Sequence, residues 1–253
     1  MTLRVERRDA VTLLTLDLPE RRNAMTAELT AAWTSAVAAL RDDPDVRCVV
    51  VTGEGSAFCA GGDLSWIGEG PDMHVMAVRA RMLPFYDAWL SIRDVPVPVL
   101  AAVNGPAVGA GLCLALACDV RYASPSASFS APFAKLGMHP GMAATALLPE
   151  VVGIARAREL LYTGRTVRAD EALSIGLVSA VHDDVLAATL AVADEIAASA
   201  PIAVRLTKAA LMTRVDDALS WEGLAQPVTM ASDDLREGLA SRAEKRPPRF
   251  TGA

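Results

Sequence analysis

Two short segments rich in small residues, each following a strand-like apolar run, limit the possible folds of this chain most strongly. The first, AFCAGGDL at residues 57–64, follows the apolar run at 48–52. The second, NGPAVGAG at residues 104–111, follows the run at 99–103 and opens an apolar helical pattern at 112–117. Small residues at such junctions leave backbone N–H groups uncovered, and a helix N-terminus adds its dipole to them. Two such N–H groups aimed at one point would stabilise an oxyanion, so the pattern indicates carbonyl chemistry.

Ordinary turns and a dinucleotide-binding loop are the other interpretations of these glycines. Glycine is common in turns because it tolerates backbone conformations that other residues avoid. Gly53 and Gly55 begin a dinucleotide-like pattern, but residues 56–58 lack the third glycine that helix–strand packing requires. The chain also has no glycine-rich loop that ends in Lys followed by Ser or Thr. Nucleotide binding is therefore the weaker hypothesis.

Composition narrows the class of protein and its partners. The 253 residues are 52% hydrophobic, which is enough for one large domain or for a domain with a helical appendage. The net charge of −6 argues against nucleic acid and anionic membranes as partners. The uncharged stretch at 95–118 is interrupted by prolines and glycine, which favours a buried strand, a turn and a buried helix over a membrane span.

The cysteines and the first residues point to a cytoplasmic protein. The four cysteines have no paired metal-ligand spacing and lie in apolar surroundings, so we expect buried, reduced thiols and no metal site. Residues 1–9 contain no apolar core of the kind that a signal peptide has.

Hydrophobic periodicity predicts an α/β fold with a largely buried sheet. Strands are expected at residues 3–8, 11–17, 48–52, 99–103, 119–122 and 127–130. Helices are expected at about 26–41, after residue 72 to residue 90, and at 112–117, 183–199, 202–214 and 216–230. Pro84 should kink or split the second of these helices. The helical C-terminal part is too thin to fold alone, so it should pack on the core or on a neighbouring subunit.

Seven segments, in this order and spacing, carry a resemblance to a known family. They are residues 19–25, 57–64, 98–120, 136–141, 160–164, 171–178 and 244–250. Together they resemble the crotonase superfamily, the enoyl-CoA hydratase/isomerase family. The resemblance implies a crotonase-like spiral of ββα units, with an acyl-CoA-binding core at 1–195 and a helical trimerisation region at 196–253. It also implies a homotrimer or homohexamer, an acyl-CoA ligand, and no cofactor beyond the coenzyme A of the substrate.

The resemblance assigns site residues position by position. The two backbone donors to the thioester oxygen would be Ala60 and Ala110. The substrate-binding positions would be Arg22, Ala24, Gly62, Asp63, Leu64, Gly109, Cys113, Phe133 and Gly141. Arg22 is the basic residue best placed for the CoA phosphates, whereas Lys208 and Arg249 are expected to be solvated surface residues.

The catalytic side chains depart from the family pattern. Family hydratases use two glutamates, and the corresponding positions here hold Cys113 and Phe133. Phenylalanine transfers no protons, and an unperturbed thiol has a pKa of about 8.5, so neither replaces a carboxylate near neutral pH. The sequence therefore does not predict standard two-glutamate hydration.

His139 is the candidate replacement acid or base, because it lies in a segment that borders the acyl pocket in the family. Its alternative role is that of a hydrogen-bonded turn residue. Glu69, Asp72 and His74 are expected in a solvated loop, and Tyr86 in the core or in the pocket wall. Three hypotheses remain, namely a crotonase-type enzyme with a nonstandard acid/base, a non-catalytic acyl-CoA carrier or regulator, and a dinucleotide enzyme.

Overall fold

The middle strands of the central sheet, at residues 11–16, 48–53 and 99–103, are buried on both faces, as their apolar runs predict. The computed structural model describes residues 2–63, 74–211, 223, 226–246 and 248, and six strands form this sheet in the order β1-β2-β3-β4-β6-β9. The β1–β2 pair is antiparallel, and every other pair in the sheet is parallel. The strands are β1 Leu3–Arg8, β2 Val11–Leu16, β3 Cys48–Gly53, β4 Val99–Val103, β6 Val120–Ala123 and β9 Ala180–Val181.

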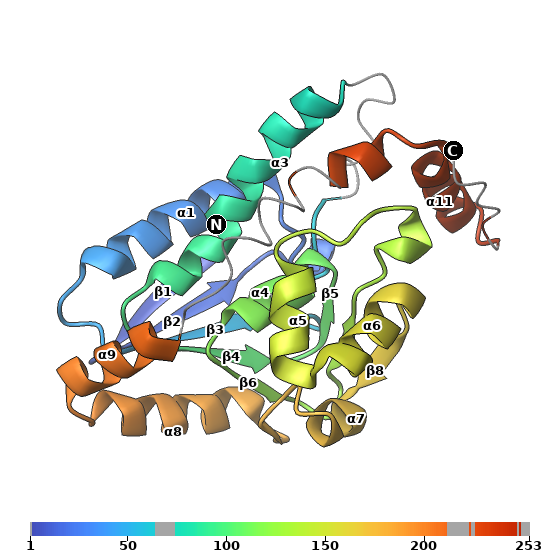
Figure 1. Ribbon diagram of the computed structural model, residues 1–253. Coiled ribbons are helices and arrows are strands. Elements are labelled where there is room, and N and C mark those ends of the chain that lie inside the picture. Colours follow the sequence, from blue (N-terminus) through green and yellow to red (C-terminus); the bar gives the residue numbers. More distant parts are fainter. Residues whose placement is uncertain (1, 64–73, 212–222, 224–225, 247, 249–253) are drawn as a thin grey trace.

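Helices cover both faces of this sheet (Figure 1). They are α1 Ala27–Asp42, α3 Val75–Leu90, α4 Ala110–Ala117, α5 Ala144–Val152, α6 Ile154–Thr163, α7 Ala169–Ser174, α8 Val185–Ala197, α9 Pro201–Leu211 and α11 Asp233–Ala243. Successive side chains of a strand point to opposite faces. Val49 and Val51 therefore belong to the larger core, together with α1, α3 and α4. Cys48 and Val50 belong to a smaller core between the sheet and α8.

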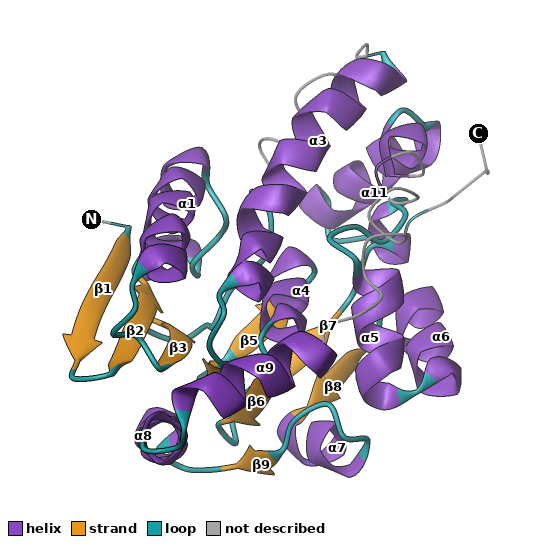
Figure 2. Ribbon diagram, turned by 60° about the vertical axis from the view of Figure 1, so that its left-hand side comes forward, coloured by secondary structure: helices purple, strands orange, loops and turns teal. Residues whose placement is uncertain are grey.

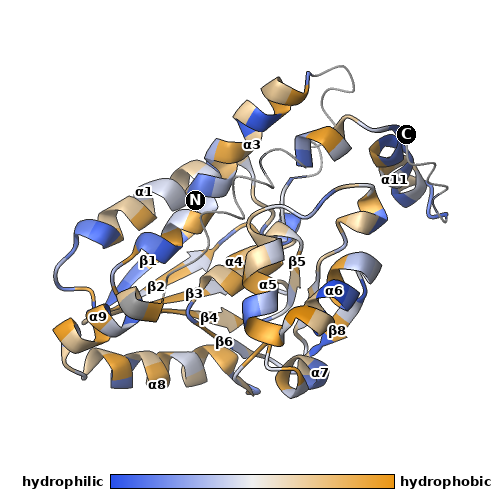
Figure 3. Cartoon of the chain, viewed as in Figure 1, coloured by the Kyte–Doolittle hydropathy of each residue, from blue (hydrophilic) through white to orange (hydrophobic). Residues whose placement is uncertain are grey.

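A second, smaller sheet lies beside the first and carries the segment that leads into α4 (Figure 2). It contains β5 Pro106–Val108, β7 Ser128–Ser130 and β8 Thr166–Arg168. β5 pairs parallel with β7, and β7 pairs antiparallel with β8. The segment at 104–111, expected as a loop, thus contains a short strand. In Figure 3 the strands β2, β3 and β4 and the helix α4 are largely hydrophobic, whereas β1 and α11 are largely hydrophilic.

Several sequence-based expectations change in detail. α3 runs through Pro84 as a single helix, so the proline does not split it. Residues 59–63, which directly follow the pattern at 53–58, are not helical, whereas a dinucleotide-binding loop leads straight into a helix. Most of the helix predicted at 216–230 lies outside the described residues, although 226–230 are helical. The division at residue 195 stays a prediction.

Among the described residues, no single helix is long and apolar enough to cross a membrane. One bent pair, α8 with the helix that follows it, passes the length and composition criteria when the two are taken together.

Candidate active site

The two small-residue segments lie against each other through backbone hydrogen bonds. The Cys59 N–H donates to the Pro106 carbonyl over 3.1 Å, and the Val108 N–H donates to the Cys59 carbonyl over 3.0 Å. Gly111 permits this approach, because a Cβ at that position would overlap the Cys59 carbonyl. β5 therefore holds the first segment beside the N-terminus of α4.

Two asparagines that the sequence analysis missed fix the base of the first segment. The Nδ2 of Asn23, a fully buried residue, donates to the Ala57 carbonyl over 2.8 Å and to the Glu54 carbonyl over 3.0 Å. The Nδ2 of Asn104 donates to the Gly55 carbonyl over 3.0 Å. Asparagine is typical beside tight turns, but the sequence alone does not show which distant carbonyls it binds.

The backbone N–H groups of Gly62 and Ala110 have no partner in the described part of the chain. Ala110 is the first residue of α4, where no intrahelical acceptor exists for its N–H. Gly61 brings the two segments close, since a Cβ built on it would lie 3.4 Å from the Ala110 nitrogen. Its φ of 94° also favours glycine. Both N–H groups belong to residues that line one cavity.

The Ala60 N–H does not fit the donor role that the sequence analysis gave it. It donates to the Arg22 carbonyl over 2.9 Å and is therefore already paired. Arg22 has a left-handed φ of 51°, at the point where the chain leaves a short 3-10 turn. This long-range backbone contact is invisible in the sequence.

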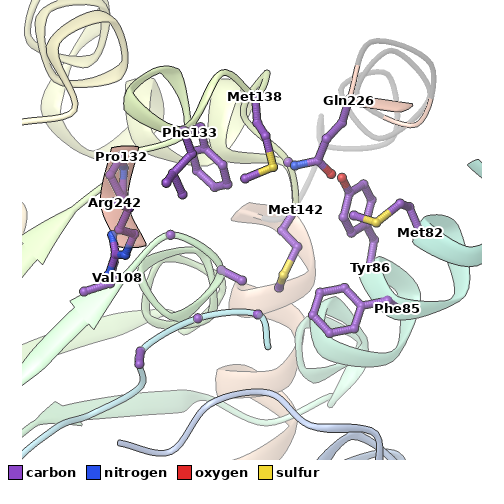
Figure 4. A pocket seen from close by; sticks show the side chains of 17 residues that line it. Met82, Phe85, Tyr86, Val108, Pro132, Phe133, Met138, Met142, Gln226 and Arg242 are labelled. Carbon is purple, nitrogen blue, oxygen red and sulfur yellow. The ribbon is translucent and has the colours of Figure 1, made fainter. Parts of the chain in front are cut away.

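The cavity beside these N–H groups has mainly apolar walls (Figure 4). Its side chains include Met82, Phe85 and Tyr86 from α3, together with Val108, Pro132, Phe133, Leu136, Met138 and Met142. Tyr86 is 1% exposed and lies in the pocket wall, one of the two places expected for it. Gln226 and Arg242 also line the cavity, and no sequence pattern singled them out. None of the described lining residues is Asp, Glu or His.

Neither position that corresponds to a family glutamate supplies a carboxylate. Phe133 lines the cavity, with its ring 3.9 Å from the point where a Cβ on Gly109 would lie. Cys113 is 1% exposed and does not line the cavity, and its Sγ lies 3.5 Å from the Gly141 carbonyl oxygen. Gly109 and Gly141 themselves line the cavity, and their role in substrate binding stays a prediction.

His139 lies outside this cavity and borders a different hollow between α6 and α11. Its Nδ1 donates to the Pro140 carbonyl over 2.7 Å, since a carbonyl oxygen can only accept. Its backbone N–H donates to the Thr229 hydroxyl over 2.9 Å, and its carbonyl accepts from Gln226. The structure thus corrects the acid/base assignment, and the alternative of a hydrogen-bonded turn residue fits.

The remaining substrate-binding candidates lie around the first segment. Arg22 is exposed and Ala24 is half-buried, and neither lines the cavity. Asp63 pairs with Arg21 over 2.8 Å between Oδ2 and Nη2, and it borders a separate groove between α1 and α3. Leu64 lies outside the described residues, as do Glu69, Asp72 and Arg249. His74 caps α3, where its Nδ1 accepts from the Met76 N–H over 3.2 Å.

Lys208 is buried, which corrects the expectation of a solvated side chain. Its Nζ lies 2.8 Å from the Asp119 Oδ2 and donates to the Val97 carbonyl over 2.9 Å. The same carboxylate oxygen accepts from the Val99 N–H over 2.7 Å. Lys208 thus connects α9 with the start of β4 and has no access to a ligand.

The cysteines are buried and free, as predicted. Burial raises the pKa of the Cys48, Cys59 and Cys118 thiols to about 12, which makes them inert near neutral pH. In the described ranges, no cluster of three or more His, Cys, Asp and Glu side chains is arranged to hold a metal ion.

Known proteins are similar to this chain in sequence and in fold. The model of the enoyl-CoA hydratase/isomerase family matches residues 6–253. A probable enoyl-CoA hydratase, EchA14 of Mycobacterium tuberculosis, is 45% identical over 79% of this chain and 77% of its own length. A crotonyl-CoA hydratase of Syntrophomonas wolfei is 35% identical over 97% of this chain and 96% of its own.

Solved structures are similar over the whole chain. The crystal structure of an enoyl-CoA hydratase/isomerase from Pseudoalteromonas atlantica superposes with a TM-score of 0.86 at 36% identity. It covers 99% of this chain and 100% of that one.

Proposed function

The chain belongs to the enoyl-CoA hydratase/isomerase family, and we propose that it binds an acyl-CoA thioester with the thioester oxygen between the Gly62 and Ala110 N–H groups. The observation that carries this proposal is that both N–H groups lie beside one apolar cavity and have no partner among the described residues. Gly62 replaces Ala60 as the first donor, because the Ala60 N–H is already bound to the Arg22 carbonyl.

The arrangement suits stabilisation of an enolate. Negative charge that develops on a thioester oxygen is stabilised by donors that are oriented before the reaction starts, in surroundings that exclude water. Ala110 adds the N-terminal end of the α4 dipole to this effect. The apolar walls of Met82, Phe85 and Phe133 would hold the acyl chain. No cofactor beyond the coenzyme A of the substrate is part of this proposal.

The reaction we propose is of the hydratase/isomerase type, with the rate enhancement derived mainly from the N–H pair. Cys113 and Phe133 offer no carboxylate, and His139 is directed elsewhere. A second candidate function is acyl-CoA binding without turnover. The absence of Asp, Glu and His among the described lining residues favours it. The homotrimer or homohexamer implied by the family resemblance remains part of the proposal.

Removal of one donor tests the proposal. Proline is well tolerated at the first position of a helix, so Ala110→Pro should fold while it loses the N–H. We expect butyryl-CoA to bind about tenfold more weakly to this variant, as measured by calorimetry, because one hydrogen bond is lost. Ala110→Gly is the matched control, because it keeps the N–H and should bind within about twofold of the wild type.

Selective labelling with 15N-glycine and 15N-alanine separates the two candidate first donors. Saturation with butyryl-CoA should shift the amide protons of Gly62 and Ala110 downfield and leave that of Ala60 in place. Undiminished binding by a folded Ala110→Pro variant, or a shift confined to Ala60, would contradict the proposed pair.

A further inference from the structure

Arg242 brings a positive charge to the wall of the proposed acyl cavity. The residue lies in the last turn of α11 and lines the cavity, and every other described lining residue is uncharged. Figure 4 shows its side chain on the side of Val108 and Pro132, away from Met82 and Tyr86. The described walls therefore combine apolar surface with a single cation at one end.

The fold supplies no counterion for this cation in the described part of the chain. The guanidinium of Arg242 has no hydrogen-bond or ion-pair partner among the described residues. On a helix, a side chain meets those three or four positions away, and none of positions 238, 239, 245 and 246 holds an acid. A negative charge that enters the cavity would thus meet an arginine that is available to bind it.

The acids closest to Arg242 in the chain are bound to a different arginine. The Glu237 Oε2 accepts from the Arg246 Nη2 over 2.8 Å, and Glu244 forms an ion pair with the same guanidinium. Neither Glu237 nor Glu244 lines the cavity. The two acids therefore neutralise Arg246 and leave the charge beside the cavity unmatched.

Two other roles for Arg242 need no acyl group of a special kind. The residue is exposed, and a cation in the last turn of a helix is favoured by the helix dipole alone. A phosphate of coenzyme A is a second possible anion. Neither role makes the protein discriminate between acyl groups, so a comparison of acyl groups separates both from carboxylate binding.

We propose that Arg242 binds a carboxylate at the far end of the acyl group, so that the protein prefers CoA esters of dicarboxylic acids to uncharged esters of equal length. The planar guanidinium matches a carboxylate with two parallel hydrogen bonds, and the apolar walls beside it strengthen their attraction. Arg242 is then a specificity-determining residue. This inference rests on the proposed acyl-CoA binding and adds the class of acyl group.

Calorimetric titration of the full chain compares ligands in matched pairs. Malonyl-, glutaryl- and adipyl-CoA are each paired with the monocarboxylic ester of the same number of carbons, namely propionyl-, valeryl- and hexanoyl-CoA. In the wild type we expect at least one dicarboxylic ester to bind about fivefold or more tightly than its partner. The terminal methyl ester of the preferred ligand has nearly the same shape and no charge, so it should lose this gain.

Variants assign the preference to Arg242. Arg242→Met keeps a long side chain without the charge, and it should abolish or reverse the preference, because a carboxylate beside apolar walls is then unpaired. The affinity for hexanoyl-CoA should change by less than about twofold. Arg236→Met is the matched control, since it removes a positive charge from the same helix at a residue that does not line the cavity. The control should keep the wild-type preference.

Each contrary outcome points to a different error. Equal wild-type affinity within every pair would overturn the proposal and leave Arg242 as a solvated residue of the helix end. If Arg242→Met weakens free coenzyme A and all esters by the same factor, the residue binds a phosphate and the proposal is likewise wrong. No binding of any CoA ester, hexanoyl-CoA included, would instead overturn the proposed function. The wild-type comparison with the methyl ester stands even if Arg242→Met does not fold.

Discussion

Ala60 and Gly62 are two positions apart, yet their backbone amides have different roles because only one of them has a nearby acceptor. The Arg22 carbonyl takes the Ala60 N–H and leaves that of Gly62 open to the cavity. The surroundings likewise decide the roles of the side chains. Phe133 lines the cavity where a carboxylate would be needed, and Cys113 lies behind Gly141. At this scale the cavity has the two N–H groups that we propose as oxyanion donors, and its described lining residues lack the two carboxylates expected of a family hydratase.

Slow hydration of crotonyl-CoA is the prediction at the residue scale. Each missing acid/base group typically removes ~10²–10⁴-fold in rate, so we expect kcat/KM well below ~10⁴ M⁻¹s⁻¹ in a spectrophotometric assay. Phe133→Glu should raise this rate, whereas Phe133→Gln, similar in shape and unable to transfer a proton, should not. A wild-type kcat/KM above ~10⁴ M⁻¹s⁻¹ would mean that another group supplies the acid/base catalysis.

Polar contacts hold helix α9 on the core, namely the Lys208–Asp119 ion pair and the hydrogen bonds from Arg205 to the carbonyls of Pro44 and Val46. Ile202 and Leu206 on this helix are 73% and 65% exposed, whereas Lys208 is 8% exposed. Its ammonium group joins Asp119, which also receives the Val99 N–H at the start of β4. The position of α9 on the sheet therefore depends strongly on this contact.

Removal of that contact should destabilise the protein. Lys208→Met leaves the Asp119 carboxylate without its cation, and we expect the free energy of unfolding to fall by about 2–4 kcal/mol in urea titrations. The double variant Lys208→Met/Asp119→Asn should recover part of the loss, since the unpaired charge is then removed as well. The single variant Asp119→Asn completes the comparison. If the losses of Lys208→Met and Asp119→Asn add up to the loss of the double variant, the two side chains do not act as a unit.

Across the whole molecule, burial in the cores on the two sides of the main sheet governs the acidity of three thiols. Cys48 lies in the core beneath α8, and Cys59 and Cys118 lie in the larger core. Each thiol has a pKa raised to about 12, chiefly by desolvation. The helical C-terminal part would provide the contacts of the proposed trimer or hexamer, which remain a prediction.

Alkaline pH should therefore weaken the fold. The unfolded thiols ionise near pH 8.5 and the folded ones near 12, so the unfolded state binds fewer protons between these values and stability falls as pH rises. Each thiol contributes a slope of up to about 1.4 kcal/mol per pH unit. In urea titrations from pH 8 to 10.5, Cys59→Ala should lower the slope by about one proton relative to the wild type. An unchanged slope would show that Cys59 ionises equally in both states.

The sequence by itself determined the elements whose causes are local. Continuous apolar runs predicted the buried strands β3 and β4, and helical periodicity predicted α1, which begins after the Thr26 cap. The small residues at 57–64 and 104–111 predicted paired backbone donors, and their spacing carried the family resemblance that the family model confirms.

Tertiary structure decided everything that depends on which distant group lies nearby. Gly62 rather than Ala60 keeps an open N–H because the Arg22 carbonyl folds back onto the loop. The His139 ring lies outside the cavity and donates a hydrogen bond to the Pro140 carbonyl. Lys208 forms an ion pair with Asp119, which is distant in the sequence. Gln226 lines the cavity and its amide binds the carbonyl of His139, which is 87 positions away in the chain. A local sequence pattern indicates which residues favour a helix or a strand and which are buried. It does not indicate which distant groups form hydrogen bonds, because only the fold brings those groups together.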